Sequence, residues 1–311
     1  MSRRSGTGDD PPDPGVDTVI SERRHLINLA YRLLGSLTEA EDAVQEAYAR
    51  WYAMSEQERG EIASPGAWLT TVASRICLDV LGSARARRER YVGEWLPEPL
   101  PGPAQWASGR PGGTADTADP ADRVTLDESV SMALLVVLDS MTPAERVAFV
   151  LHDVFRYPFA DVAGITGRTA AACRQLATSA RRHIRASQPP AASATRQASL
   201  IRDLRQAWEA KDISALIVLL DPGATMTADG GGLASAALHP IEGGQQVARY
   251  LVDIASRAAT LTLLERTVNG QPGLVAKQDG VTVTVFAFDV AGDRITRIWA
   301  IRNPDKLRPW T

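Results

Sequence analysis

The sequence predicts a multi-domain protein, with two all-α helical domains followed by an α+β domain that has a curved antiparallel sheet. Its 311 residues suffice for two or three domains, each with a core of its own. Apolar residues recur with helical periodicity over 19–90 and again over 124–184, whereas strand-like segments separated by turn signals fill 260–302. Helices followed by a meander of strands are typical of an α+β domain in which the sheet wraps on helices.

Stretches rich in Pro, Gly and Ser mark the domain boundaries. Because such segments cannot bury enough apolar surface to become ordered, we expect a disordered N-terminus and two linkers. The predicted division is a disordered N-terminus at 1–17, a helical domain at 18–95, a linker at 96–122, a second helical domain at 123–187, a linker at 188–197 and the α+β domain at 198–311.

The charge and cysteine content exclude several classes of protein. With 34 basic and 37 acidic residues the net charge is −3, which excludes a uniformly basic nucleic-acid coat but allows local basic faces. Cys77 and Cys173 lie far apart in helical segments, so we expect neither a disulfide framework nor a paired-cysteine zinc site. The sequence contains no apolar run of 18 residues and no secretory signal. We therefore expect a cytoplasmic protein with no membrane partner, metal or cofactor.

The first motif is a helix with an acidic face, predicted over residues 38–53. Thr38 and Glu41 have the spacing of a capping box, so Thr38 is the predicted N-cap. Apolar residues then recur from Ala40 to Trp51 as a buried stripe. The opposite face carries Asp42, Gln45 and Glu46. This face is either a solvated polar surface or a docking site for a basic partner helix, and the helix alone does not distinguish the two.

A second motif joins a helix that begins at Ser64-Pro65 to a cluster of arginines. Pro is tolerated in the first turn of a helix, and Trp68 begins the apolar stripe. The side chains that we expect to be exposed on this helix are Thr71, Ser74 and Arg75. The segment SARARRERY then brings in Arg85, Arg87 and Arg88. This cluster either contacts nucleic-acid phosphates or forms a solubilising helix end, where positive charge also suits the helix dipole.

The third motif is a helix-turn-helix. Thr142 as N-cap and Glu145 three residues later mark the start of the helix that precedes it. A short helix at 159–165, a turn that contains Gly167 and a longer helix at 169–185 follow. A short helix, a Gly-bearing turn and a longer helix are the elements of a DNA-reading unit.

The longer helix of this motif has the composition of a DNA-recognition helix. Between residues 168 and 185 there are five Arg, one His and no acidic residue. Arg can bind a guanine edge through two hydrogen bonds, Gln can read adenine, and other side chains can hold phosphates. The side chains expected to contact DNA are Arg168, Thr169, Arg174, Gln175, Thr178, Arg181 and Arg182. An ordinary helical hairpin with a basic flank is the alternative, but the absence of acidic residues favours DNA binding.

The C-terminal segment is predicted to form helices at 199–211, 213–220 and 242–257 and strands at 260–269, 274–278, 281–290 and 294–302. An enzyme in such a domain needs a buried acid or base, for which the candidates are Asp229, His239, Glu242 and Asp253. Asp229 lies in a Gly-rich stretch that is typical of a turn, and His239 precedes Pro240 as at the end of a strand. We interpret these residues as structural and expect no catalytic activity.

Three groups of sequence segments together resemble one family. The segments AYRLLGSLTEAEDAVQEAYARWY and SPGAWLTTVASRICLDVL resemble region 2 of bacterial sigma factors, and LDSMTPAERVAFVLHDVFRYPFADVAGITGRTAAACRQLATSARRHIR resembles region 4. Two such regions without an intervening third domain are similar to the extracytoplasmic-function group. The segments WLPEPL, DGGG and NPDKL resemble the subgroup with a SnoaL-like C-terminal extension, which implies a cone-shaped α+β domain. Leu233 and Cys77 depart from the subgroup's usual Lys and Asn.

This resemblance implies a promoter-recognition function with core RNA polymerase, through its clamp helices and flap region, and promoter DNA as partners. Asp42, Gln45 and Glu46 would dock on the clamp helices. The helix beginning at Pro65 would engage the −10 element, with the 55–64 loop capturing a flipped base and the arginines after it holding phosphates. The helix beginning at Thr169 would read the −35 element.

The resemblance also implies that the C-terminal domain modulates this function by contacting the first linker. The expected regulatory interface consists of Trp95, Pro97, Glu98, Asp229, Gly230, Asn303, Asp305 and Lys306. The cone could in addition hold an unknown small ligand. Two alternatives stay open: a stand-alone, ligand-responsive DNA-binding regulator with the cone as sensor, and a cone-domain isomerase or hydrolase tethered to a DNA-binding module.

Overall fold

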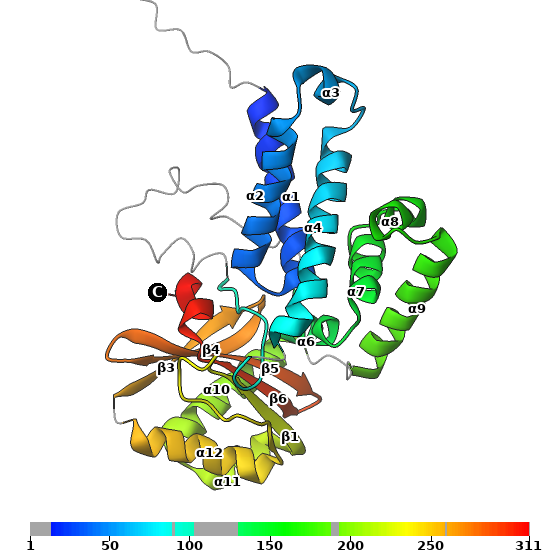
Figure 1. Ribbon diagram of the computed structural model, residues 1–311. Coiled ribbons are helices and arrows are strands. Elements are labelled where there is room, and N and C mark those ends of the chain that lie inside the picture. The colour runs from blue at the N-terminus through cyan, green and yellow to red at the C-terminus, as the bar shows by residue number, and fades with distance from the viewer. Residues whose placement is uncertain (1–13, 89–90, 103–129, 188–192, 259, 311) are drawn as a thin grey trace, which may run out of the picture.

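The structure, a computed structural model, describes residues 14–88, 91–102, 130–187, 193–258 and 260–310. Most of the segments expected to be disordered or to act as linkers, 1–13, 103–122 and 188–192, lie outside the described residues. Two groups of helices stand side by side above a C-terminal α+β domain (Figure 1). None of the helices in the described part of the chain is both long and apolar enough to cross a membrane.

The first helical group contains the acidic helix and the helix of the second motif. Its elements are α1 (Pro14–Leu34), α2 (Leu37–Ala53), the short α3 (Glu56–Gly60) and α4 (Pro65–Arg88). Helix α1 begins at Pro14, inside the segment 1–17 that was expected to be disordered. The N-cap of α2 is Ser36, whose hydroxyl accepts the Glu39 amide at 3.3 Å, and not Thr38. The positive φ of Gly35, +72°, turns the chain at once after α1, so the N-cap of α2 lies two residues earlier than predicted.

The second helical group contains the helix-turn-helix. Its elements are α6 (Met132–Asp139), α7 (Pro143–Phe149), the π-helical turn η2 (Val150–Val154), α8 (Phe159–Thr166) and α9 (Ala170–Ser187). The capping box of Thr142 and Glu145 is confirmed, and Gly167 ends α8 in the left-handed conformation. Helix α4 packs on α7 and α8, so that the two groups share one continuous core. The π-helical turn was not predicted.

The C-terminal domain consists of helices α10 (Ala194–Glu209), α11 (Ile213–Leu219) and α12 (Gly244–Arg257), strands β1 (Leu220–Asp229), β2 (Ile241–Glu242), β3 (Leu261–Val268), β4 (Gln271–Gln278), β5 (Val281–Ala291) and β6 (Arg294–Ile301), and the 3-10 helix η3 (Pro304–Trp310). Helix α10 begins inside the predicted 188–197 linker. The sheet order is β2-β1-β6-β5-β4-β3, and β1 runs parallel to β6, so the sheet is mixed and not fully antiparallel. Strand β1 was not predicted because Pro222 and Gly223 suggest a break.

The two faces of this sheet have different roles. Helices α10, α11 and α12 cover one face, where Trp208 meets Phe286 edge-to-face and donates its indole N–H to the Leu251 carbonyl. The other face buries Val285 and Trp299 against residues from outside the domain. These residues are Leu96 from the first linker and Met132 from α6. The second face of the sheet is therefore the surface that joins the C-terminal domain to the helical groups.

Candidate functional site

The acidic face of α2 is open to solvent. Ala43, Val44 and Ala47 are buried in the helical core, which turns the opposite side outward. Asp42, Gln45 and Glu46 are all exposed on that side. The structure therefore places the three predicted residues together on one accessible surface.

Helix α4 presents fewer free side chains than the sequence predicted. Ser74 is fully buried, so its predicted exposure is wrong. The reason is that α4 is covered on two sides, by α1 and α2 and also by α7 and α8, whereas its apolar stripe indicated only one buried side. Thr71 is half-buried and donates its hydroxyl to the Ala67 carbonyl. Arg75 is exposed but donates to the carbonyl of Gly164 in α8 at 2.8 Å.

The arginine cluster at the C-terminal end of α4 is only partly described. Helix α4 continues through Arg88, so the cluster belongs to the helix. The side chains of Arg85, Arg87 and Arg88 lie outside the described part of the structure. Their predicted contact with phosphates stays a prediction.

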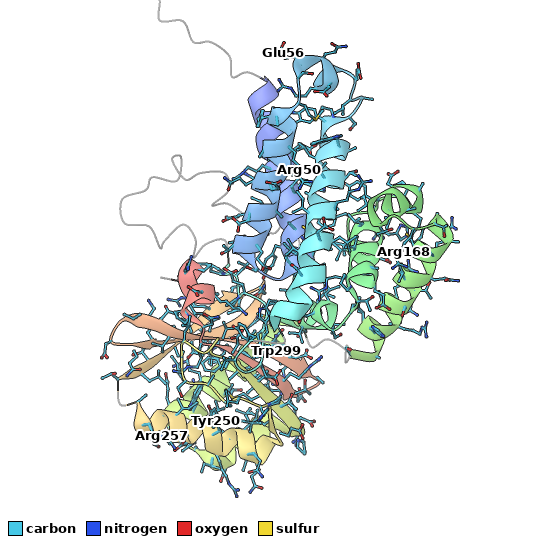
Figure 2. The ribbon with its side chains drawn as sticks, in the orientation of Figure 1. Arg50, Glu56, Arg168, Tyr250, Arg257 and Trp299 are labelled. Carbon is cyan, nitrogen blue, oxygen red and sulfur yellow. The ribbon has the colours of Figure 1, made fainter. Side chains whose placement is uncertain are left out.

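Helix α9 carries a basic, solvent-exposed face. Cys173, Ala177 and Ala180 are buried against α7 and α8 and fix which side of the helix faces outward. The predicted residues that are exposed are Arg168 (labelled in Figure 2), Thr169, Arg174, Gln175, Thr178 and Arg182. The hydroxyl of Thr169 accepts the Ala172 amide at 3.1 Å, so Thr169 is the N-cap of this helix.

Arg181 differs from its neighbours on α9. Its guanidinium binds both carboxylate oxygens of Asp153 in η2, at 2.7 and 3.3 Å, and its side chain is only 37% exposed. The prediction that Arg181 points freely outward is therefore wrong. The sequence could not reveal this pair, because Asp153 lies 28 residues away in an unpredicted π-helical turn.

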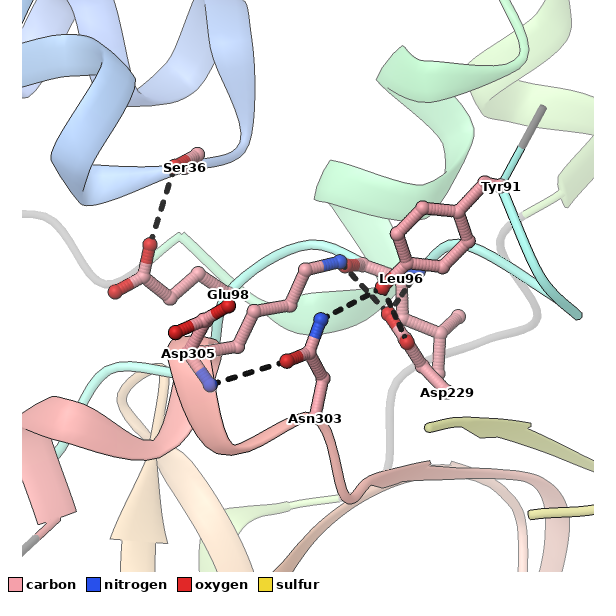
Figure 3. Close-up of polar contacts among 8 residues, drawn as sticks. Ser36, Tyr91, Leu96, Glu98, Asp229, Asn303 and Asp305 are labelled. Atoms are coloured by element: carbon pink, nitrogen blue, oxygen red, sulfur yellow. Dashed lines mark hydrogen bonds and ion pairs between the residues drawn. The ribbon is translucent and has the colours of Figure 1, made fainter. Parts of the chain in front are cut away.

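A buried polar cluster joins the first linker to the C-terminal domain (Figure 3). At its centre is Asp229, the last residue of β1, which has no exposed surface. Its carboxylate accepts hydrogen bonds from the Tyr91 hydroxyl (2.7 Å), the Leu96 amide (2.9 Å) and the Lys306 ammonium (2.7 Å). Asp229 thus ends strand β1 where the Gly-rich sequence suggested a turn, and it is a carboxylate buried between segments far apart in the chain.

The NPDKL segment supplies the other half of this cluster. Asn303 donates its amide to the Tyr91 hydroxyl at 2.8 Å, and its own side-chain oxygen accepts the Asp305 amide. Lys306 also donates to the Leu96 carbonyl, and its ammonium lies 4.2 Å from the ring centre of Trp95. Gly230 allows a close approach here, since a Cβ at this position would lie 2.1 Å from the Ala234 carbonyl oxygen.

Glu98 links the same linker to the start of α2. Its buried carboxylate accepts the Leu37 amide at 2.7 Å and the Ser36 hydroxyl at 3.3 Å. Burial raises the pKa of Glu98 above its ordinary value, although these hydrogen bonds and the charge of Lys306 act in the opposite direction. Pro97 is buried beside Gly35. Seven of the eight residues of the expected interface therefore lie at the junction of linker, α2 and C-terminal domain, and Gly230 follows Asp229 within the C-terminal domain.

Tyr91, which also belongs to this junction, was not singled out from the sequence. It contacts both Asp229 and Asn303, and burial raises its pKa well above the ordinary value. Tyr31 in α1 was not singled out either. Its hydroxyl donates to the Glu98 carbonyl and accepts from the side-chain amide of Asn269 in the C-terminal domain. Lone aromatic residues in a linker or a helical stripe give no local signal of such distant partners.

Two hollows lie near these groups. One, of about 390 Å³, opens at the junction and is lined by residues that include Ser36, Tyr91, Trp95 and Lys306. The other lies inside the cone, beside Trp208 and Phe286, and measures about 60 Å³. Ligand pockets are usually about 300–1,000 Å³, so this hollow is smaller than a typical small-molecule site.

Comparison with known proteins agrees with these features. The Sigma-70 region 2 family matches residues 19–88, and the Sigma-70 region 4 family matches residues 131–184. The chain is 37% identical to the ECF RNA polymerase sigma factor SigJ of Mycobacterium tuberculosis, over 92% of this chain and 90% of that protein. It is 35% identical to the probable ECF RNA polymerase sigma factor SigI of the same organism, over 96% of each.

The likeness extends to the whole architecture. The crystal structure of Mycobacterium tuberculosis SigJ superposes with a TM-score of 0.72 at 35% identity, covering 94% of this chain and 98% of that one. The match therefore includes the C-terminal α+β domain as well as the two sigma regions. The chain belongs to the extracytoplasmic-function RNA polymerase sigma factors.

Proposed function

We propose that this chain is a cytoplasmic promoter-specificity subunit of RNA polymerase. The observation that carries the assignment of the DNA-reading surface is the exposed basic face of α9 in a capped helix-turn-helix with no acidic residue from Arg168 to Arg185. The N-terminal part of such a helix enters the major groove, where Arg and Gln read base edges. In this account α9 reads the −35 element, and Asp42, Gln45 and Glu46 of α2 bind the clamp helices of core polymerase.

Region 2, residues 18–95, supplies the second DNA contact in this proposal. Thr71 and Arg75 of α4 engage the −10 element, and Arg85, Arg87 and Arg88 hold phosphates. Ser74 has no such role in the observed arrangement because it is buried. Support for Arg75 comes from its exposed position on the same helix as the arginine cluster.

The observed arrangement is a closed one that must open on a promoter. Thr70 of α4 lies 3.2 Å from the Tyr157 hydroxyl, and Arg75 binds α8, so region 2 packs directly on region 4. The −10 and −35 elements lie about 25 base pairs, or roughly 85 Å, apart at about 3.4 Å per pair. Two DNA-reading helices in one shared core cannot span that distance, so we infer that polymerase and promoter separate α4 from α8.

We further propose that the C-terminal domain modulates this opening and has no catalytic activity. It holds the segment from Tyr91 to Leu100 through Asp229, Lys306 and Asn269, which ties the end of region 2 and the start of the linker to the sheet. Asp229, the most buried of the candidate acid–base residues, is occupied by three donors. A ligand sensor is less well supported, because the cone cavity is only about 60 Å³.

The test is RNA synthesis with added core polymerase. The full chain and core polymerase together are expected to make short abortive transcripts from promoters selected by pull-down of the holoenzyme, and neither component does so alone. A chain that binds promoter duplex tightly without polymerase and never supports initiation would instead be a stand-alone regulator. The variant Arg182→Ala removes one exposed positive charge from α9, so it should weaken initiation on all promoters without abolishing it.

A further inference from the structure

The π-helical turn η2 places two consecutive side chains against the recognition helix. It lies between α7 and α8 and presents His152 and Asp153, both half-buried. π-Helical turns are rare and are frequently found at functional sites, because the added residue re-aims the side chains that follow. Asp153 contacts Arg181 of α9 directly, and His152 contacts a ring on which Arg174 of α9 lies.

His152 reaches its arginine through an aromatic ring. Its imidazole stacks on Phe159, the first residue of α8, with the ring centres 3.7 Å apart and the planes 23° from parallel. The imidazole is held in turn by its Nδ1–H, which donates to the Tyr157 carbonyl at 2.9 Å. The Cζ atom of Arg174 lies 5.6 Å from the centre of the Phe159 ring, a cation–π contact.

Arg174 and Arg181 are held in chemically different ways. Two residues seven apart lie on the same side of a helix. Asp153 engages the Nε and one Nη of Arg181, which occupies the hydrogen-bonding edge of that guanidinium. An arginine that stacks on an aromatic ring keeps its N–H edge available for a bidentate acceptor. Of these two arginines, Arg174 is therefore the one prepared to bind the O6 and N7 of a guanine.

Prior positioning matters because Arg is long and flexible. A side chain that is free in solution loses rotamer freedom when it docks, and holding it beforehand reduces that loss. Arg174 is exposed in the second turn of α9, the part of such a helix that reads bases. The Phe159 ring is a rigid support for this purpose, because it stacks on an imidazole that is itself held by a hydrogen bond.

We propose that Phe159 and His152 are positioning residues that hold Arg174 ready to read a guanine of the −35 element. The inference rests on the proposed function, since it assumes that α9 reads that element. It assigns base reading to Arg174 and a structural role to Arg181. Neither Phe159 nor His152 needs to touch DNA for this.

The experiment uses holoenzyme and a set of promoters in which each −35 base pair is replaced in turn. The chain variants are Arg174→Ala, Phe159→Leu, Phe159→Tyr and His152→Ala, each checked for folding by thermal unfolding. Arg174→Ala is expected to lower discrimination at one guanine by about 5- to 150-fold. Phe159→Leu should lower it at the same base by about 2- to 5-fold, the size of an exposed cation–π contact. Phe159→Tyr keeps the ring and should keep the discrimination.

The outcomes separate this inference from the proposed function. It is supported if Phe159→Leu and His152→Ala act only at the base that Arg174→Ala affects, and if Phe159→Leu adds nothing in an Arg174→Ala background. Suppose that Arg174→Ala lowers discrimination at one base pair, but Phe159→Leu either leaves discrimination unchanged or lowers transcription equally from every promoter. The inference is then overturned, and the proposed function stands. A uniform loss with Arg174→Ala means phosphate contact and also overturns it. If transcription by the wild-type holoenzyme does not depend on the −35 sequence, both fail.

Discussion

Lys306 and Asp229 form an ion pair of 2.7 Å between η3 and the end of β1, with side chains that are 11% and 0% exposed. The pair also holds the linker, since the Leu96 amide donates to Asp229 and the Leu96 carbonyl accepts from Lys306. The last residues of the chain thereby stabilise the exit from region 2. Through this contact the C-terminal domain holds the segment that directly follows region 2, the DNA-reading domain.

Replacing Lys306 by Met should destabilise the chain strongly. The change leaves the Asp229 carboxylate buried without its cation, and breaking a buried pair in this way costs about 3–5 kcal/mol. Arg308→Gln is the matched control, because its ion pair with Asp305 is exposed and such pairs contribute about 0–1 kcal/mol. Urea unfolding of the full chain measures both variants. Equal effects of the two changes would show that the junction pair does not stabilise the fold.

Glu98 should make stability fall as the pH rises. Because burial raises its pKa in the folded chain, the folded state keeps the proton where the unfolded state has lost it. Relative to Glu98→Gln, the wild-type free energy of unfolding should be greatest below about pH 4.5 and should decrease as the pH rises through the folded-state pKa. Unfolding of both proteins across a pH series measures this difference. A wild-type advantage that grows with pH would contradict the assigned direction.

Arg181 and Arg182 should differ in their contribution to DNA affinity, although they are adjacent. Arg182 is exposed, so Arg182→Ala should reduce the slope of log affinity against log salt by about 1. Arg181→Ala should leave that slope nearly unchanged, because Asp153 already neutralises this guanidinium. Asp153→Asn releases Arg181 and should steepen the slope. Equal slopes for both alanine variants would show that Arg181 leaves Asp153 when DNA binds.

The closed arrangement of regions 2 and 4 should open in the holoenzyme. Dyes attached through Tyr52→Cys in α2 and Ala186→Cys in α9 would report their separation by energy transfer. The two native thiols do not interfere, since Cys77 and Cys173 are buried and burial raises the pKa of Cys77 to about 12. The transfer measured in the free chain should fall when core polymerase and promoter are added. Unchanged transfer in an active complex would mean that α4 and α8 stay together.

Local chemistry made much of the helical part predictable. The box of Thr142 and Glu145 and the left-handed Gly167 place α7 to α9 correctly, because caps and turns depend on residues close in sequence. Ser74 was wrongly expected to be exposed, since periodicity reveals one apolar stripe but not a second group of helices packed on the same helix. Residue spacing therefore identified the surfaces of α2 and α9 better than that of α4.

The parts that depend on distant partners were less predictable. Strand β1 contains Pro222 and Gly223, and it is held by parallel pairing with β6, about 70 residues later. The residues of the regulatory interface were named through resemblance to a family, while the burial of Asp229 and the role of Tyr91 became visible only in the structure. Their partners lie more than 70 residues away, where no pattern within one element can indicate them.

Binding of the full chain to core RNA polymerase tests the central claim most directly. The double variant Asp42→Asn/Glu46→Gln removes two charges from the exposed face of α2, and Asp279→Asn/Asp293→Asn removes two exposed charges from the C-terminal domain as a matched control. If α2 docks on the polymerase, the first variant should weaken holoenzyme assembly about tenfold or more, while the control binds like the wild type. Wild-type affinity in the first variant would contradict the account.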